Sequence, residues 1–446
     1  MIVEIPSHFA EERIYTLKVL LKEFLGLTFE YEVNEGITDV IISHNDRQLI
    51  IEDHFFNLYK DDYLIKDSIP GSIQSFSSPE WEVENVPVIY GASEISVSNN
   101  AVRCRLDLIA STFFMLTRWE EHVVNEYDQH GRFEAKRSLA YREGFLDRPI
   151  VNEYVELLFK LLQHIDPELK RSERKFNIVP THDVDHLRLW KDFVSIRKRL
   201  AHNFITQKRI KVGIQNLFDA FLTKMNLKSD PFDSFDYLMN HSEEAGVQSR
   251  FYILGGGETK FDKNFNYERS EFKSLSDNIE ARGHIIGYHP NYLAFENDQE
   301  WIKHKIGLEK VVGNPLTEGR HHFLRFRAPY TWQLWEEHQM NCDSTLGYHD
   351  QPGFRCGVSY PFSVFNFITR EHLKLIERPL IFMEVTPIEY MKMGVDDTIE
   401  LVDQLLSSVK KYKGDFVFLW HNSSLFTAEF KPYIKVYEHI MNTSEV

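Results

Sequence analysis

Strand-like and helix-like segments alternate from about residue 176 to the end of the sequence, and this alternation constrains the fold more than any other feature. Short apolar runs such as 248–254 and 415–419 have the length and composition of buried strands. Segments with helical periodicity, such as 299–311 and 397–409, separate these runs. The pattern predicts an α/β fold with a parallel sheet or barrel.

Polar residues follow the expected strands at the points where the strands end. The clearest case is the segment Thr-His-Asp-Val-Asp-His at 181–186, which follows an apolar run. Residues i and i+2 of an extended chain share a face, so Asp183 and Asp185 can converge on one point. There they repel each other unless a cation or a proton separates them. The alternative is a solvated acidic turn. Other strand ends that we expect at the same edge carry His289, Arg327 with Tyr330, Asp343 with Arg355, and His421.

The N-terminal part of the chain has a different organisation. Residues 10–25 have helical periodicity and are followed by short strand-like pieces, whereas residues 106–165 form helical stripes. A charged linker at 170–175 marks a boundary. We therefore predict an accessory domain at 1–172, an α/β piece followed by a helical piece, and a second domain at 173–446. A basic helical insertion near 187–226 would either steer an anionic substrate or form a solvated face.

Charge and cysteine content exclude several classes of partner. The formal net charge of −16 argues against nucleic acid or an anionic membrane as the main partner. Cys104, Cys342 and Cys356 form no CxxC pair, which disfavours a zinc–thiolate site and a disulfide framework, although a Cys342–Cys356 bridge remains open. We find no signal-peptide pattern and no apolar stretch long enough to span a membrane. We therefore expect a cytoplasmic protein without a transmembrane segment.

The strand-end motifs, taken in order, resemble those of the NodB-type polysaccharide deacetylases, which are carbohydrate esterases with a distorted (β/α)7 barrel. The resemblance covers roughly residues 176–425, and the ordered set is more specific than any single motif. Residues 106–162 also resemble the accessory domain that precedes some members in Bacteroidetes-type bacteria. The matching motifs are 181–185, 283–289, 326–330, a weak match around Asp343, and 419–421.

The resemblance implies catalytic roles that suit these residue types. Asp183 would be the general base, and Arg327 would hold it ionised through charge-assisted hydrogen bonds. The backbone N–H of Tyr330 would stabilise an oxyanion. His421 would be the general acid, tuned by Asp343.

The resemblance also implies a metal and a substrate class. Asp185 and His289 would bind one divalent metal, most simply zinc, which would activate water and polarise an acetyl carbonyl. The substrate would be a carbohydrate, such as an acetylated sugar or a polysaccharide precursor, and the reaction would be removal of its acetyl group or cleavage of a related C–N bond. Further candidates for binding or supporting roles are His322, Asp343, Arg355, Asn291 and Trp420.

One departure from the family pattern concerns the metal. The second motif of the family supplies two histidines four residues apart, but Leu293 stands four residues after His289. Leucine cannot bind a metal, so a third ligand must come from elsewhere, and Asn291, His186 and His322 are open alternatives. His322 lies five residues before Arg327, which in a regular strand is about 16 Å. The departure leaves two hypotheses: a hydrolase whose metal site is rebuilt or that works without a metal, or an altered barrel that binds a glycan or a partner without turnover.

Overall fold

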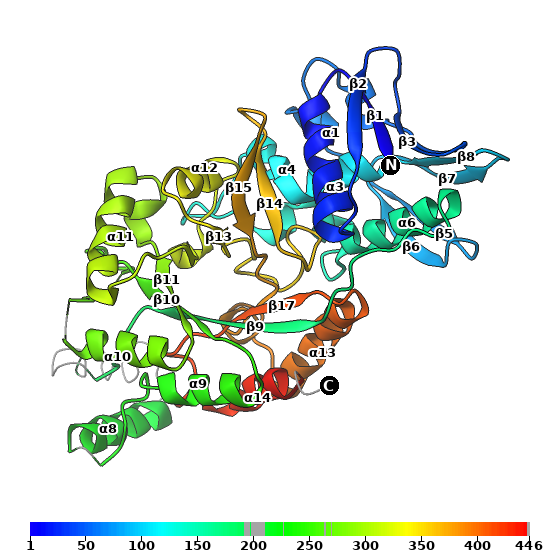
Figure 1. Ribbon diagram of the computed structural model, residues 1–446. Coiled ribbons are helices and arrows are strands. Elements are labelled where there is room, and N and C mark those ends of the chain that lie inside the picture. Colours follow the sequence, from blue (N-terminus) through cyan, green and yellow to red (C-terminus); the bar gives the residue numbers. More distant parts are fainter. Residues whose placement is uncertain (191–196, 198–209, 226, 263–264, 269, 444–446) are drawn as a thin grey trace.

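The computed structural model describes residues 1–190, 197, 210–225, 227–262, 265–268 and 270–443. It is a mixed α/β structure built on two large sheets (Figure 1), and the predicted α/β class is confirmed. The predicted insertion at 187–226 lies in part outside the described residues.

The N-terminal region contains a six-stranded mixed sheet and a separate hairpin. The sheet has the order β2 (Glu30–Asn34), β1 (Ile2–Pro6), β3 (Val40–His44), β4 (Arg47–Ile51), β8 (Ala101–Leu106) and β7 (Gly91–Val97), and the hairpin is β5 (Gln74–Ser78) with β6 (Val83–Val88). Its helices are α1 (Ala10–Leu17), the π-helix η1 (Lys18–Phe24), α2 (Phe55–Leu58), η2 (Lys66–Ser68), α3 (Leu108–Thr117), α4 (Trp119–Val124), η3 (Ala135–Arg137), α5 (Leu139–Arg142) and α6 (Ile150–Ile165).

The C-terminal region is organised around a nine-stranded sheet. Its order is β14 (Phe362–Asn366), β15 (Glu371–Glu377), β13 (Cys342–Asp343), β12 (Glu318–Gly319), β11 (Ile285–His289), β10 (Arg250–Leu254), β9 (Asn177–Val184), β17 (Asp415–Leu419) and β16 (Phe382–Met383). The helices are α8 (Ile210–Lys224), α9 (Phe235–Glu244), α10 (Ser270–Ala281), η5 (Tyr292–Phe295), α11 (Asp298–Val312), η6 (His322–Leu324), α12 (Tyr330–Glu337), the π-helix η7 (Thr386–Tyr390), α13 (Val395–Lys411), η8 (Lys431–Tyr433) and α14 (Ile434–Asn442).

The pairing of this sheet determines where the strand-end residues meet. All its strands pair in parallel except β14, which is antiparallel to β15. The first strand, β9, lies between β10 and the last strand, β17. Because parallel strands end at the same edge, the segments after β9, β11, β12, β16 and β17 come together there. The seven-stranded barrel closure remains a prediction.

Helix α3 is buried along its whole length, and its N-terminus is capped by Asp107, whose carboxylate accepts from Ala110 N–H at 2.9 Å.

The two regions share one hydrophobic core and a buried charge network. Arg355 donates to Glu121 of α4 at 2.6 and 2.9 Å, and Arg118 donates to the same carboxylate at 3.0 Å. Burial opposes ionisation of Glu121, but the two guanidinium groups hold its pKa below the usual value. Arg355 therefore joins the two regions and does not support the site.

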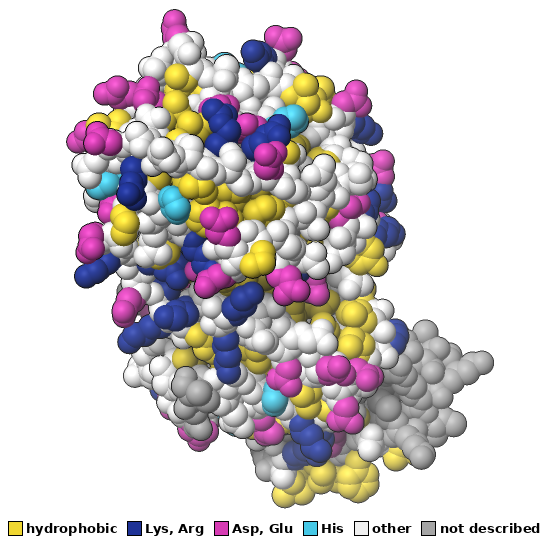
Figure 2. Space-filling view, turned by 90° about the vertical axis from the view of Figure 1, so that its right-hand side faces the viewer, with side chains coloured by type: hydrophobic (Ala, Val, Ile, Leu, Met, Phe, Trp, Pro, Cys, Tyr) yellow, Lys and Arg dark blue, Asp and Glu magenta, His cyan; other side chains and the backbone are white. Residues whose placement is uncertain are grey.

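Helix α8 carries a stripe of exposed apolar side chains. Ile214, Leu217, Phe218 and Phe221 follow helical spacing and are each more than half exposed. Hydrophobic side chains gather at the foot of the molecule in Figure 2, the level at which α8 lies in Figure 1. Trp190 packs against Ala220 of this helix.

Two further predictions concern the cysteines and membrane-spanning helices. Cys104, Cys342 and Cys356 are all buried and free, so Cys342 and Cys356 form no bridge. Among the described helices, none combines the length and the apolar character that a membrane crossing requires.

Candidate metal centre and catalytic site

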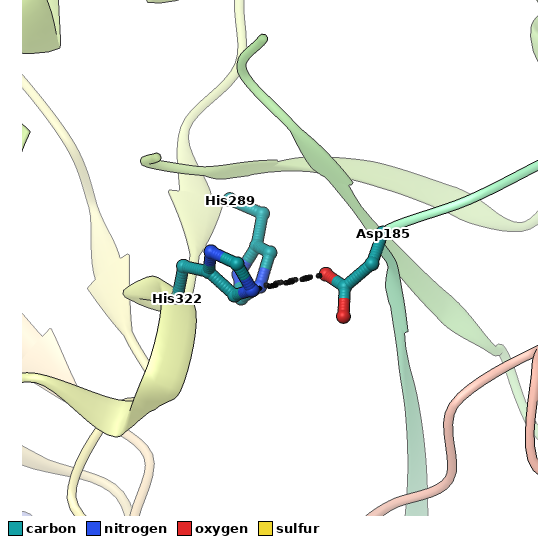
Figure 3. A group of neighbouring side chains, drawn as sticks. All are labelled: Asp185, His289 and His322. Atoms are coloured by element: carbon teal, nitrogen blue, oxygen red, sulfur yellow. Dashed lines mark ion pairs between the residues drawn. The ribbon is translucent and has the colours of Figure 1, made fainter. Parts of the chain in front are cut away.

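Three side chains at the C-terminal edge of the sheet point their ligand atoms at one another (Figure 3). Asp185 follows β9, His289 ends β11, and His322 begins η6; one ligand atom from each lies within 4.8 Å of the other two. The Nε2 atoms of His289 and His322 are 3.4 and 3.7 Å from Asp185 Oδ1. Asp185 Oδ1 and His289 Nε2 are buried without a hydrogen-bond partner in the described part of the chain. Such orphaned acceptors are what a cation would satisfy.

The outer nitrogens of the two imidazoles are held in a way that fits metal binding. His289 Nδ1 donates to the carbonyl of Arg320 at 2.5 Å, and His322 Nδ1 lies 3.3 Å from the buried carboxylate of Asp262. These contacts favour the tautomer that presents Nε2 to the ion. Burial opposes ionisation of Asp185, but the two imidazoles hold its pKa well below the usual value. Two imidazoles and a carboxylate form a donor set that zinc uses in proteins.

The third ligand residue, His322, comes from a backbone turn that the sequence pattern did not reveal. Around His322 the chain is a short 3₁₀ turn in which Phe323 has φ of 65° and Leu324 has φ of 53°. The 16 Å estimate assumed a regular strand, so it does not apply. Leu293 is 49% exposed, and the side chain of Asn291 caps η5 by accepting from the N–H groups of Leu293 and Ala294. Asn291 is therefore a helix cap in this structure.

Asp183 is held by an arginine that the sequence analysis missed. Arg320 Nη1 donates to Asp183 Oδ1 and to Thr181 Oγ1, both at 2.9 Å, and its other nitrogens bind Ser344. The predicted clamp, Arg327, instead pairs with Glu296 at 3.1 Å, so that assignment is wrong. Arg320 follows β12 directly and so enters the strand-end edge. No apolar run marked it, because β12 is only two residues long.

His421 is paired with a carboxylate, but the partner is Glu384 and not Asp343. Glu384 follows β16, and its Oε1 accepts from His421 Nδ1 at 2.7 Å and from the backbone N–H of His421 at 3.1 Å. Asp343 is fully buried and accepts from the N–H and the hydroxyl of Thr345, so it does not tune His421. Burial disfavours the imidazolium, but Glu384, with Asp185 and Asp183, raises the pKa of His421 to about 10.

Replacing Glu384 with glutamine should lower the pKa of His421, because Glu384 is the carboxylate that stabilises the imidazolium most. The folded pKa of about 10 lies above the unfolded value of 6.5. The stabilisation from this pair is therefore fully present below pH 6.5 and is lost as pH rises toward 10. NMR titration of the metal-free protein would measure the shift. Asp403→Asn, beside the exposed His439, is the control and should leave His421 unchanged; an unchanged His421 in Glu384→Gln would contradict the assignment.

Two other predicted residues lie away from this edge. Tyr330 begins α12, is 52% exposed and has its ring beside His122, and it is not among the described residues that line the cavity, so the oxyanion role of its backbone N–H stays a prediction. Trp420 is fully buried, and its indole N–H donates to the carbonyl of Ser424 at 2.8 Å. Trp420 therefore orders the loop after β17 and does not line the cavity.

One cavity of about 320 Å³ is lined by the three residues of the donor set and also by Asp183 and His421. Its walls also include Phe323, Leu324, Met383, Val385, Tyr390 and Phe430, with Glu389, Ser423 and Thr427 as polar groups. His186 also lines it, and its ring stacks on Phe232. One wall residue, Arg132, comes from the N-terminal region. The volume is in the range of small-molecule sites.

Comparisons with known proteins find a family model that matches the N-terminal region and solved structures that match about three fifths of the chain. A family of unknown function, DUF7033, matches residues 1–167. No curated protein matches the chain. Structural neighbours include a Mycobacterium smegmatis protein assigned as a polysaccharide deacetylase, with 16% identity and a TM-score of 0.39, covering 62% of this chain and 86% of its own.

Two more neighbours belong to carbohydrate esterase family 4. One is the Streptomyces lividans enzyme in complex with acetate, with 9% identity and a TM-score of 0.29, covering 61% of this chain and 88% of its own. The other is a pseudoenzyme from Bacillus anthracis, with 8% identity and a TM-score of 0.30, covering 61% of this chain and 62% of its own. These similarities are too low to assign an activity, which has to be argued from the site itself.

Proposed function

We propose that the protein is a metal-dependent hydrolase that removes an acetyl group from a sugar, and that residues 173–446 form a relative of the NodB-type barrel. The observation that carries the proposal is the convergence of three arrangements on one cavity. These are the Asp185–His289–His322 donor set, the Asp183–Arg320 pair and the His421–Glu384 pair.

Asp185, His289 and His322 would hold the divalent cation, with zinc as the first choice. When bound, such a cation polarises a carbonyl oxygen and lowers the pKa of a coordinated water. The Asp183 Oδ2 atom lies 3.7 Å from His289 Nε2, so a carboxylate stands directly beside the donor set.

Asp183 and His421 have the positions and partners for opposite proton transfers. Asp183 is engaged by Arg320 through Oδ1 and would accept a proton from the attacking water. His421 is engaged by Glu384 through Nδ1, and its Nε2 has no partner among the described residues. With a pKa raised to about 10, mainly by Glu384 against the effect of burial, its imidazolium persists at neutral pH. It would donate its proton to the leaving amine or alkoxide.

The cavity walls suit a sugar carrying a small acyl group. Tyr390 and Phe323 provide aromatic faces, and Ser423, Thr427 and Glu389 provide hydrogen-bonding groups for hydroxyls. These features support an N- or O-acetylated sugar without choosing between amide and ester.

Acetate release from acetylated sugars tests the proposal, with Asp183→Asn as the decisive variant. We expect loss of the general base to lower kcat by roughly 10²–10⁴-fold while the metal content of the protein is unchanged. Asp236→Asn, at an exposed ion pair with Arg282, is the matched control and should retain full activity. Acetate release that persists in Asp183→Asn would remove the assigned base. If the metal-loaded protein binds sugars but releases no acetate from any of them, the non-catalytic glycan-binding alternative would replace this proposal.

A further inference from the structure

A loop of the N-terminal region, residues 128–133, forms part of the cavity wall and is fixed to the C-terminal region. Arg325 Nε donates to the carbonyl of His130 at 2.7 Å, and His130 Nδ1 lies 3.1 Å from the hydroxyl of Tyr292. Just after the loop, Ala135 N–H donates to the carboxylate of Asp350 at 3.3 Å. The loop is therefore held in place before any ligand binds.

Within this loop, Arg132 is oriented by Asp128. Arg132 Nε donates to Asp128 Oδ2 at 2.8 Å, and Nη2 forms an ion pair with the same oxygen at 2.7 Å. Asp128 Oδ1 accepts from the N–H groups of His130 and Arg132. Burial opposes ionisation of Asp128, but these hydrogen bonds and the guanidinium lower its pKa. One edge of the guanidinium is thus occupied, while Nη1 has no hydrogen-bond partner among the described residues.

Arg132 lines the same cavity as the metal ligands. The guanidinium lies 5.9 Å from the ring centroid of Phe323, whose ring is 4.7 Å from that of His322. His349, the neighbouring imidazole, stays neutral because burial and Arg132 lower its pKa to about 3. Arg132 is consequently the one Arg or Lys side chain among the described residues that line this cavity.

We propose that Arg132 binds an anionic oxygen group of the substrate, a carboxylate or a phosphate, so that the N-terminal region determines substrate choice. The inference rests on the proposed function and adds the class of sugar: an acidic one. Arginine binds such groups through charge-assisted hydrogen bonds, and the contact with Asp128 means that little side-chain freedom remains to be lost on binding. Asp183 and Asp185 cannot take this role, because they repel an anion and have partners of their own.

Calorimetric binding of three sugars to the zinc-loaded protein tests this inference without requiring turnover. The probes are N-acetylglucosamine, its 6-phosphate, and N-acetylmuramic acid, which carries a carboxylate. We expect at least one acidic sugar to bind roughly 10–100-fold more tightly than the neutral one, the range for a charge-assisted hydrogen bond. Inorganic phosphate as a competitor, with and without zinc, separates binding at Arg132 from binding at the metal.

Arg132→Gln should remove the preference for the acidic sugar and leave the affinity for N-acetylglucosamine unchanged. Arg132→Lys keeps the charge but not the planar fork and should retain only part of the preference. Arg137→Gln is the matched control, since Arg137 pairs with Glu134 and Glu126 outside the cavity. Equal binding of all three sugars to the wild type, or no binding of either acidic sugar, would overturn the inference. So would a preference that survives in a folded Arg132→Gln. If the protein prefers the acidic sugar but releases no acetate, the proposed hydrolase activity is refuted and the proposed anion-binding role of Arg132 is retained.

Discussion

Replacing His322 with alanine is expected to release the metal. His322 supplies one of three ligand atoms, and without it the remaining carboxylate and imidazole form a two-point site. Loss of an outer-shell partner costs about 10–100-fold in metal affinity, and we expect the loss of a ligand to cost more than about 100-fold. Asp262→Asn, which changes the outer contact of His322 and keeps all three ligand residues, should fall in the 10–100-fold range. Zinc titration against a chelating dye would measure both.

The same experiment has a control at the position where the family pattern carries its histidine. Leu293→His should add no affinity and should not rescue His322→Ala, because the side chain at 293 is directed to solvent. A gain in zinc binding by Leu293→His, or full zinc content in His322→Ala, would show that the ligand set is wrong. Circular dichroism would confirm that each variant is folded.

Replacing Arg320 with methionine is expected to reduce the free energy of unfolding by about 3–5 kcal/mol, the cost of removing one partner from a buried ion pair. Arg320 is fully buried, and Asp183 would keep a buried negative charge without its partner. Denaturant unfolding monitored by tryptophan fluorescence measures the change.

Arg327→Met is the matched control for this experiment. Arg327 is about one third exposed and pairs with the exposed Glu296, so its replacement should cost less than about 1 kcal/mol. Equal destabilisation by the two substitutions would contradict the assignment of Arg320 as the clamp. A second substitution, Asp183→Asn, should recover part of the stability lost in Arg320→Met, because it removes the unpaired charge.

The sequence predicted those features that depend on local pattern. Apolar runs of strand length led to β9, β10, β11 and β17, and parallel pairing places the residues that follow them at one edge. Asp183, Asp185, His289 and His421 each lie in a strand or within two residues of its end, so their convergence followed from the strand assignment alone.

Residues whose partners lie on short or irregular elements could not be predicted in this way. Arg320 and Glu384 follow strands of two residues, too short to produce a periodic signal. His322 reaches the site through a turn with positive φ values. The motif spacing of the family led to the assignment of Arg327 and Asp343 as partners of Asp183 and His421. In the fold, Arg327 pairs with Glu296 and Asp343 pairs with Thr345.

The sequence by itself therefore determined the α/β class, the edge where the site forms and two of the three residues in the donor set, since strand periodicity and residue chemistry are local properties. Only the tertiary structure decided which arginine holds Asp183, which carboxylate holds His421 and which histidine completes the metal site. It also brought Arg132 from the N-terminal region into the cavity. Each of these outcomes depends on the positions of backbone segments far apart in the chain, and residue spacing does not encode those positions.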